Sequence, residues 1–191
     1  MQDAGTRARI LDVALRLFAT HSFAGTSLQM IADEMALTKA AVYHHFHTRE
    51  DLLTALITPA LAEMRAVADD ADAQRTPHAR AEHMLTGFVE LAVRHRRLIA
   101  ILSNDQAILR LLKSQSLLDE LLERPVALLR ATAPEPAGRI NALLTLSGVG
   151  STAGSELLAD IDDEDLRRYL VETGRRILGL RAPRTARVPA R

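Results

Sequence analysis

The residues best suited to chemistry lie together between Thr26 and Leu53, in the segment TSLQMIADEMALTKAAVYHHFHTREDLL. Lys39 can reach a guanine edge or a phosphate, and the small side chain of Ala40 permits close approach to bases and contact with a thymine methyl group. Tyr43 offers a hydroxyl group to a phosphate. These residue types therefore favour contact with double-stranded DNA.

Three histidines in the same segment, His44, His45 and His47, raise the alternative of a metal site. Contiguous helical residues point in different directions, and the chain has no cysteine to complete a ligand shell. We therefore expect no metal and no cofactor. His44 on a helix surface can instead contact a phosphate, and its partial protonation would make DNA binding sensitive to pH. No nucleophile–base pair accompanies these residues, so we expect a protein that is not an enzyme.

Two short helices must position these side chains. Ser27 and Thr38 are N-cap candidates, each able to accept hydrogen bonds from free N–H groups at the start of a helix. Val42 and Phe46 are four residues apart and face inward, which leaves Lys39 and its neighbours facing out. Thr48 and Asp51 resemble a capping box that opens a longer helix. Two short helices joined by a tight turn fit a major groove.

Apolar residues recur at spacings of three and four along the chain, and strand signals are nearly absent. The sequence predicts an all-α fold of about nine helices, with a three-helix helix-turn-helix head and a helical ligand-binding and dimerisation body. Helix boundaries are expected near residues 6–20, 28–35, 38–46, 48–70, 77–95, 97–103, 105–112, 116–131, 137–159 and 163–180.

Bulk charge gives no support for DNA binding. The 191-residue chain has 24 basic and 24 acidic side chains, and residues 1 to 52 hold five basic and six acidic ones. Phosphate attraction usually supplies much of the affinity, so the case depends on where the charges lie. The longest uncharged stretch, Ile140 to Ser155, is too short and too rich in Gly, Ser and Thr for a membrane span. With no export signal at the N-terminus, we expect a cytoplasmic protein.

The sequence here resembles the TetR family of bacterial one-component regulators. The matching residues are Phe18, Thr26-Ser27, Ile31-Ala32, the run Thr38 to Phe46, Thr48-Arg49-Glu50 and Leu52-Leu53. The resemblance implies a DNA-binding head over residues 1–50 and a ligand-binding and dimerisation body over 51–180. The tail over 181–191 is rich in Pro and Arg, and we expect it to be disordered. It implies DNA contacts for Thr26, Gln29, Lys39, Tyr43, His44 and Arg49, to which we add Ser27, Thr38 and Ala40.

Two departures from the family pattern concern turns. Ser22 and Ala36 occupy positions where such proteins usually have glycine, and a left-handed conformation would cost about 1 kcal/mol at each. Ala41 also lacks a hydroxyl group that is often present, which removes one DNA contact.

A stripe of small residues near the C-terminus predicts a close helix–helix contact. Internal packing is one interpretation. We favour a two-fold four-helix interface between identical subunits. Its expected residues are Ser147, Gly150, Ser151, Gly154, Leu158, Leu166, Leu170 and Ile177.

The almost wholly aliphatic body offers few polar groups for a ligand pocket, which needs some among apolar walls. Candidates are His83, Phe88, Asn104 and Asp105, each of which could equally be ordinary core or surface. The leading hypothesis is a homodimeric repressor on a palindromic operator, with recognition helices about 34 Å apart and release by a small-molecule effector. The alternative is a helical small-molecule-binding protein or enzyme whose head no longer binds DNA.

Overall fold

The computed structural model describes residues 2–114 and 117–180, with side chains for 5–102, 105–112 and 122–180. Within these ranges the chain forms ten α-helices, one short 3-10 turn and no strand. The all-α prediction is confirmed. The elements are α1 (Gln2–Gly25), α2 (Leu28–Glu34), α3 (Lys39–His45), α4 (Arg49–Asp72), α5 (Pro77–Arg94), α6 (Arg96–Asn104), α7 (Gln106–Ser114), α8 (Leu117–Arg130), α9 (Ala137–Ala153), η1 (Glu156–Leu158) and α10 (Asp163–Leu178).

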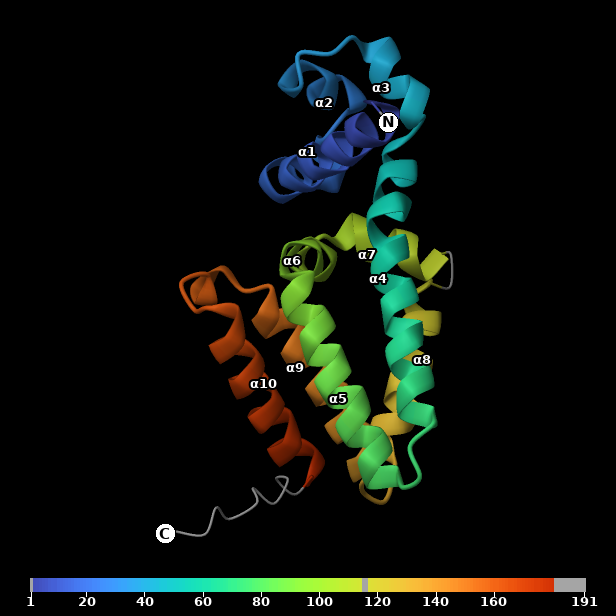
Figure 1. Ribbon diagram of the computed structural model, residues 1–191, viewed down its shortest axis with the longest axis vertical. Coiled ribbons are helices and arrows are strands. Elements are labelled where there is room, and N and C mark those ends of the chain that lie inside the picture. The colour runs from blue at the N-terminus through green and yellow to red at the C-terminus, as the bar shows by residue number, and fades with distance from the viewer. Residues whose placement is uncertain (1, 115–116, 181–191) are drawn as a thin grey trace.

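Helices α1 to α3 form one end of the molecule, and α4 runs from this end along the length of the body (Figure 1). A first hydrophobic cluster holds this end together and includes Ile10, Ile31 and Val42, each fully buried. Its members also come from α6 and α7, among them Leu98 and Ile108. The core beneath the helix-turn-helix is therefore completed by two body helices.

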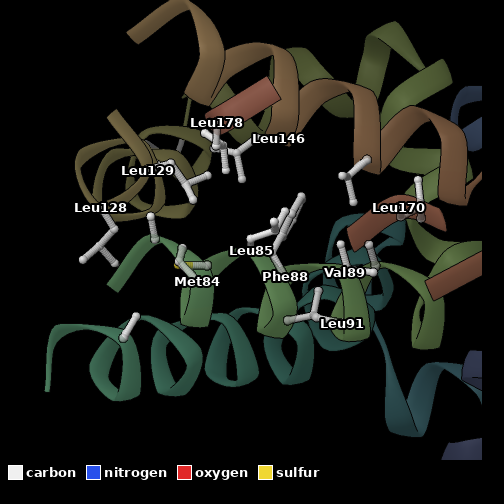
Figure 2. Close-up of a cluster of buried hydrophobic side chains, with 14 of the residues drawn as sticks. Met84, Leu85, Phe88, Val89, Leu91, Leu128, Leu129, Leu146, Leu170 and Leu178 are labelled. Atoms are coloured by element: carbon white, nitrogen blue, oxygen red, sulfur yellow. The ribbon is translucent and has the colours of Figure 1, made fainter. Parts of the chain in front are cut away.

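A second cluster fills the space between α4, α5, α8, α9 and α10, with Met84, Leu85 and Phe88 of α5 at its centre (Figure 2). Two glycines let the helices approach closely. A Cβ added at Gly174 of α10 would lie 2.5 Å from Leu85 Cδ1, and a Cβ added at Gly87 would lie 2.4 Å from a methyl carbon of Val67 on α4. Close packing of this kind leaves aliphatic side chains in contact with one another.

Both turn positions predicted to lack their usual glycine have positive φ. Ser22 (φ 63°, ψ 165°) interrupts α1 two residues after the predicted end of that helix, and Ala36 (φ 53°) follows α2. Ser22 lies in a region of backbone space that is almost restricted to glycine. Its hydroxyl group accepts the Gly25 N–H at 3.2 Å, which partly compensates for the strain.

The end of α9 differs from the prediction, which extended that helix to residue 159. The helix ends at Ala153, and Ser155 then caps η1 by accepting the Leu157 N–H. At Gly154 an added Cβ would lie 2.8 Å from the Ala100 backbone, so α6 and the end of α9 are in backbone contact. The predicted disordered tail, 181–191, lies outside the described residues.

Candidate DNA-binding surface

The helix-turn-helix is formed by α2 and α3, and both predicted N-caps are present. The Ser27 hydroxyl accepts the Met30 N–H at 3.2 Å, and the Thr38 hydroxyl accepts the Ala41 N–H at the same distance. Between the helices, the Leu37 N–H donates to the Ala32 carbonyl at 2.9 Å. These bonds satisfy backbone groups that have no partner within a helix and fix the turn.

One face of α3 is buried and the opposite face is exposed. Val42 is fully buried and Phe46 is 3% exposed. The opposite face exposes four predicted DNA contacts, Lys39, Ala40, Tyr43 and His44. The Lys39 ammonium nitrogen lies 5.3 Å from the centroid of the Tyr43 ring, which gathers a positive charge and a phenol at one place. Ser27, Gln29 and Thr38 are also exposed, on the adjoining surface of α2 and the turn.

The side chain of Thr26 is not on this surface. It is 2% exposed, and its hydroxyl group donates to the Ser22 carbonyl at 2.8 Å. Thr26 sits at the interrupted end of α1, where carbonyl groups need partners. The predicted contact between this side chain and DNA is therefore corrected, because the hydroxyl group supports the corner between α1 and α2.

Arg49 is also engaged within the chain. One guanidinium nitrogen, Nη1, donates to the carbonyl oxygens of Phe23, Ala24 and Thr26 at 3.0, 2.6 and 3.2 Å. The guanidinium carbon lies 5.3 Å from the centroid of the Phe23 ring. Arg49 thus neutralises the carbonyl end of α1, an interaction favoured by the helix dipole. The structure places this arginine in a scaffold position.

Two contacts at this end of the molecule were not predicted from the sequence. The guanidinium carbon of Arg7 on α1 lies 4.9 Å from the centroid of the Phe46 ring, at the end of α3. The Asp105 carboxylate accepts the Phe23 N–H at 2.7 Å and the Ala107 N–H at 2.8 Å. It therefore joins the corner after α1 to the start of α7. Phe23 and Asp105 are 82 positions apart, so no local pattern in the sequence predicts their contact.

The predicted capping box at the start of α4 is confirmed. The Asp51 N–H donates to the Thr48 hydroxyl at 3.0 Å, and the Asp51 carboxylate accepts the Thr48 N–H at 2.9 Å. Hydrogen bonding lowers the pKa of Asp51 below its ordinary value of 3.8, chiefly through the Thr48 side chain and then through the N–H groups of Thr48 and His47. The carboxylate form of Asp51 is thus favoured at the start of α4.

The predicted ligand residues do not converge. His83 is exposed on α5, whereas Phe88 is 8% exposed within the body cluster. Asp105 is committed to the hydrogen bonds described above, and the side chain of Asn104 lies outside those described. The prediction of one body pocket lined by these residues is corrected, because aliphatic side chains fill the space around Phe88.

The predicted dimer stripe divides between two faces. Ser147 and Ser151 are exposed, whereas Gly150 is buried and Gly154 meets the backbone of Ala100. Leu166 and Leu170 are 3% and 7% exposed within the body cluster, and Leu158 and Ile177 are half-buried. The buried members pack inside the subunit and are unavailable to a partner, which corrects the prediction for them. The exposed face of α9 instead carries Ile140, Leu143, Leu144, Ser147, Gly148 and Ser151.

The described part of the chain contains no group of three or more His, Cys, Asp or Glu side chains placed to hold a metal ion. No described helix is both long enough and apolar enough to cross a membrane.

A capped helix-turn-helix whose second helix exposes a cationic side chain is typical of DNA-binding proteins. Residues 10–56 match the family model described as "Bacterial regulatory proteins, tetR family". The segment is similar to the HTH-type transcriptional regulator AcrR of Shigella flexneri, at 47% identity over 49 residues, or 26% of this chain and 23% of that protein. It is 33% identical over 61 residues to the HTH-type transcriptional repressor AcnR of Corynebacterium diphtheriae, which is 32% of each chain.

Solved structures extend the similarity to the whole fold. Mycobacterium smegmatis AmtR superposes with a TM-score of 0.73 at 24% identity, covering 93% of this chain and 87% of that one. The ketosteroid transcriptional regulator KstR2 of Mycobacterium tuberculosis gives 0.68 at 20% identity, over 91% and 93%. Residues 10–56 thus match the amino-terminal family model of the tetR regulators, and the chain shares its overall fold with these solved structures. The matched sequence spans less than a third of the length of AcrR or AcnR.

Proposed function

We propose that the protein is a transcriptional regulator that binds operator DNA through the exposed face of α3. The observation that carries this proposal is the arrangement of Lys39, Ala40, Tyr43 and His44 on one exposed face, above a buried Val42. Small and cationic side chains at the start of a recognition helix are suited to base edges, and the tyrosine hydroxyl is suited to a phosphate.

Affinity is expected to depend on dimerisation, because the head carries no net positive charge. Two copies would place recognition helices in successive major grooves, about 34 Å apart, on a palindromic operator. Repression is the expected direction, since a bound dimer competes with other proteins for the site. The relatives AcnR and KstR2 of Rhodococcus jostii, which match the head region, are repressors by name.

The exposed apolar face of α9 supports the homodimer. Ile140 is 51% exposed, Leu144 57% and, on α10, Tyr169 55%, although large apolar side chains usually avoid water. Ser147, Gly148 and Ser151 continue this face with small side chains that allow close approach. A two-fold contact between these faces would form the four-helix interface proposed for the dimer.

Release by a small-molecule effector completes the proposal. A ligand changes DNA affinity only through different affinities for the two arrangements of the heads. The competing function, a ligand-binding protein with a DNA-incompetent head, rests on the neutral head and the strained turns at Ser22 and Ala36. The intact caps and the exposed face of α3 favour the regulator.

The test is binding of the purified protein to DNA from its own upstream region at two salt concentrations. Lys39→Ala is expected to weaken binding and to reduce the slope of log affinity against log salt by about one, since one phosphate contact is lost. Tyr43→Ala is expected to weaken binding by about 1–3 kcal/mol. Asp70→Ala, an exposed change on α4, is the control. No sequence preference, or full binding by both variants, would contradict the proposal.

A further inference from the structure

One hollow lined by described residues lies outside the body core, between the head and the body. It is a cleft of about 440 Å³ walled by α1, by α6 and by the segment that joins α9 to η1. In Figure 1 the α6 helix lies below α1. A volume of this size is in the range of small-molecule sites.

Part of the cleft lining is apolar. It includes Leu15 and Ala19 of α1 and Ala100 and Ile101 of α6. Gly154 also lines the cleft, and a Cβ added there would lie 2.8 Å from the Ala100 backbone. Backbone contact therefore fixes the lining beside Gly154.

Three arginines line the cleft, together with two carboxylates, Asp12 and Glu156. Arg16 pairs with Glu34 at 2.9 Å and Arg96 pairs with Asp163 at 3.3 Å. Both pairs are largely exposed to water, so exchange of either partner costs little. Arg97 is exposed and forms no ion pair with any residue whose side chain is described.

We propose that this cleft binds a small carboxylic acid with an apolar body. The aliphatic walls would hold the apolar part, and Arg97, assisted by Arg16, would hold the carboxylate. Guanidinium groups match the geometry of carboxylates and remain charged at all relevant pH values. The bound acid would connect α1 of the head with α6 of the body.

The cleft adjoins the contact through which Asp105 holds the head. A neighbouring hollow of about 350 Å³ shares Ala19, Ala100 and Ile101 with the cleft and reaches Ser22 and Asp105. Asp105 accepts the Phe23 N–H at 2.7 Å, directly after the strained Ser22. A ligand between α1 and α6 therefore lies beside the joint that orients the helix-turn-helix.

The direct test is calorimetric titration of the full chain with octanoate, with octylammonium and 1-octanol as the cationic and neutral probes of equal length. Octanoate is expected to bind more tightly than either. Arg97→Gln is expected to weaken octanoate binding by about fivefold, the loss of one exposed charge interaction of about 1 kcal/mol. Arg75→Gln, an exposed arginine in the turn after α4, is the matched control and should leave the affinity unchanged.

A second variant blocks the cleft without changing the contact between Ala100 and Gly154. Ala19 is exposed on the α1 wall, so Ala19→Trp can fill the cleft while the protein stays folded, as its thermal unfolding would show. Loss of octanoate binding is expected. The proposal is overturned if octylammonium binds as well as octanoate, or if Arg97→Gln and Ala19→Trp both bind octanoate like the wild type.

The regulatory part of the inference rests on the proposed function and is measured separately. Octanoate is expected to change the DNA affinity of the wild type but not that of Ala19→Trp. Octanoate binding without any specific DNA binding would contradict the proposed function but would support the ligand site. Specific DNA binding without octanoate binding would overturn the site alone.

Discussion

Arginine and lysine residues near the helix-turn-helix have separate tasks. Lys39 is exposed at the start of α3, where it is available to DNA. Arg49 donates to three carbonyl oxygens at the end of α1 and lies over the Phe23 ring. One cation is thus exposed for the proposed DNA contact and the other holds the head together, although the sequence presents both as exposed positive charges.

Replacing Arg49 is therefore expected to affect folding. Arg49→Ala leaves three carbonyl groups with fewer partners, and we expect it to lower the free energy of unfolding by about 1.5–3 kcal/mol. Lys39→Ala is expected to change that free energy by less than about 0.5 kcal/mol, as is usual for surface positions. Urea unfolding of both variants makes the comparison. Equal stability of the two would contradict the scaffold role of Arg49.

The turn after α2 stores strain at Ala36, whose φ is 53°. Glycine adopts this conformation without a Cβ clash, so Ala36→Gly is expected to raise the free energy of unfolding by about 1 kcal/mol. Ala73→Gly is the matched control, because Ala73 has φ −68° at the end of α4 and gains nothing from glycine. Thermal or urea unfolding would measure both changes. A loss of stability at Ala36→Gly would contradict the strain argument.

At the scale of elements, α4 connects the head with the body and begins in a reciprocal cap. Thr48 and Asp51 satisfy each other's N–H groups, and Asp51 also accepts the N–H of His47 at 3.1 Å. Leu52 and Leu53 follow at once and are buried in the head cluster. The cap therefore fixes where α4 starts relative to α3.

This cap is expected to make stability fall in acid. The pKa of Asp51 is lower in the folded chain than its ordinary value of 3.8, so the unfolded chain takes up a proton first. The contribution of Asp51 is thus complete above about pH 5 and is lost as the pH falls through 3.8 to the folded pKa. Asp51→Asn should be less stable than the wild type at neutral pH, with the difference shrinking in acid. Asp70→Asn, on the same helix, is the control for urea unfolding across this range.

At the scale of the whole molecule, two hydrophobic clusters meet at α6 and α7. Leu98 and Ile101 of α6 belong to the head cluster, whereas Ile99 packs against the body cluster. A shift of α6 would therefore disturb both clusters. This arrangement gives the proposed effector site beside α6 a physical path to the recognition helix.

The proposed dimer can be tested at the same scale. Leu144→Glu places a charge on the exposed face of α9, and burying it against a second copy would be costly. Sedimentation velocity is expected to give a dimer for the wild type and a monomer for the variant. Ala66→Glu, an exposed change on α4, should remain dimeric. A dimeric Leu144→Glu would show that the subunits meet elsewhere.

The sequence by itself determined the all-helical fold, the caps at Ser27, Thr38 and Thr48, and the outward face of α3. Each depends on residues within about one helical turn of one another, so local spacing carries the information. The positive φ values at Ser22 and Ala36 were expected from the resemblance, because similar proteins usually have glycine at these turn positions.

Only the tertiary structure decided which exposed-looking residues are engaged and which small residues lie inward. Arg49 reaches carbonyls more than twenty residues away, and Gly154 meets Ala100 on α6. The cleft between α1 and α6 joins segments more than seventy residues apart in sequence. Such contacts follow from how whole helices pack, so local spacing does not encode them.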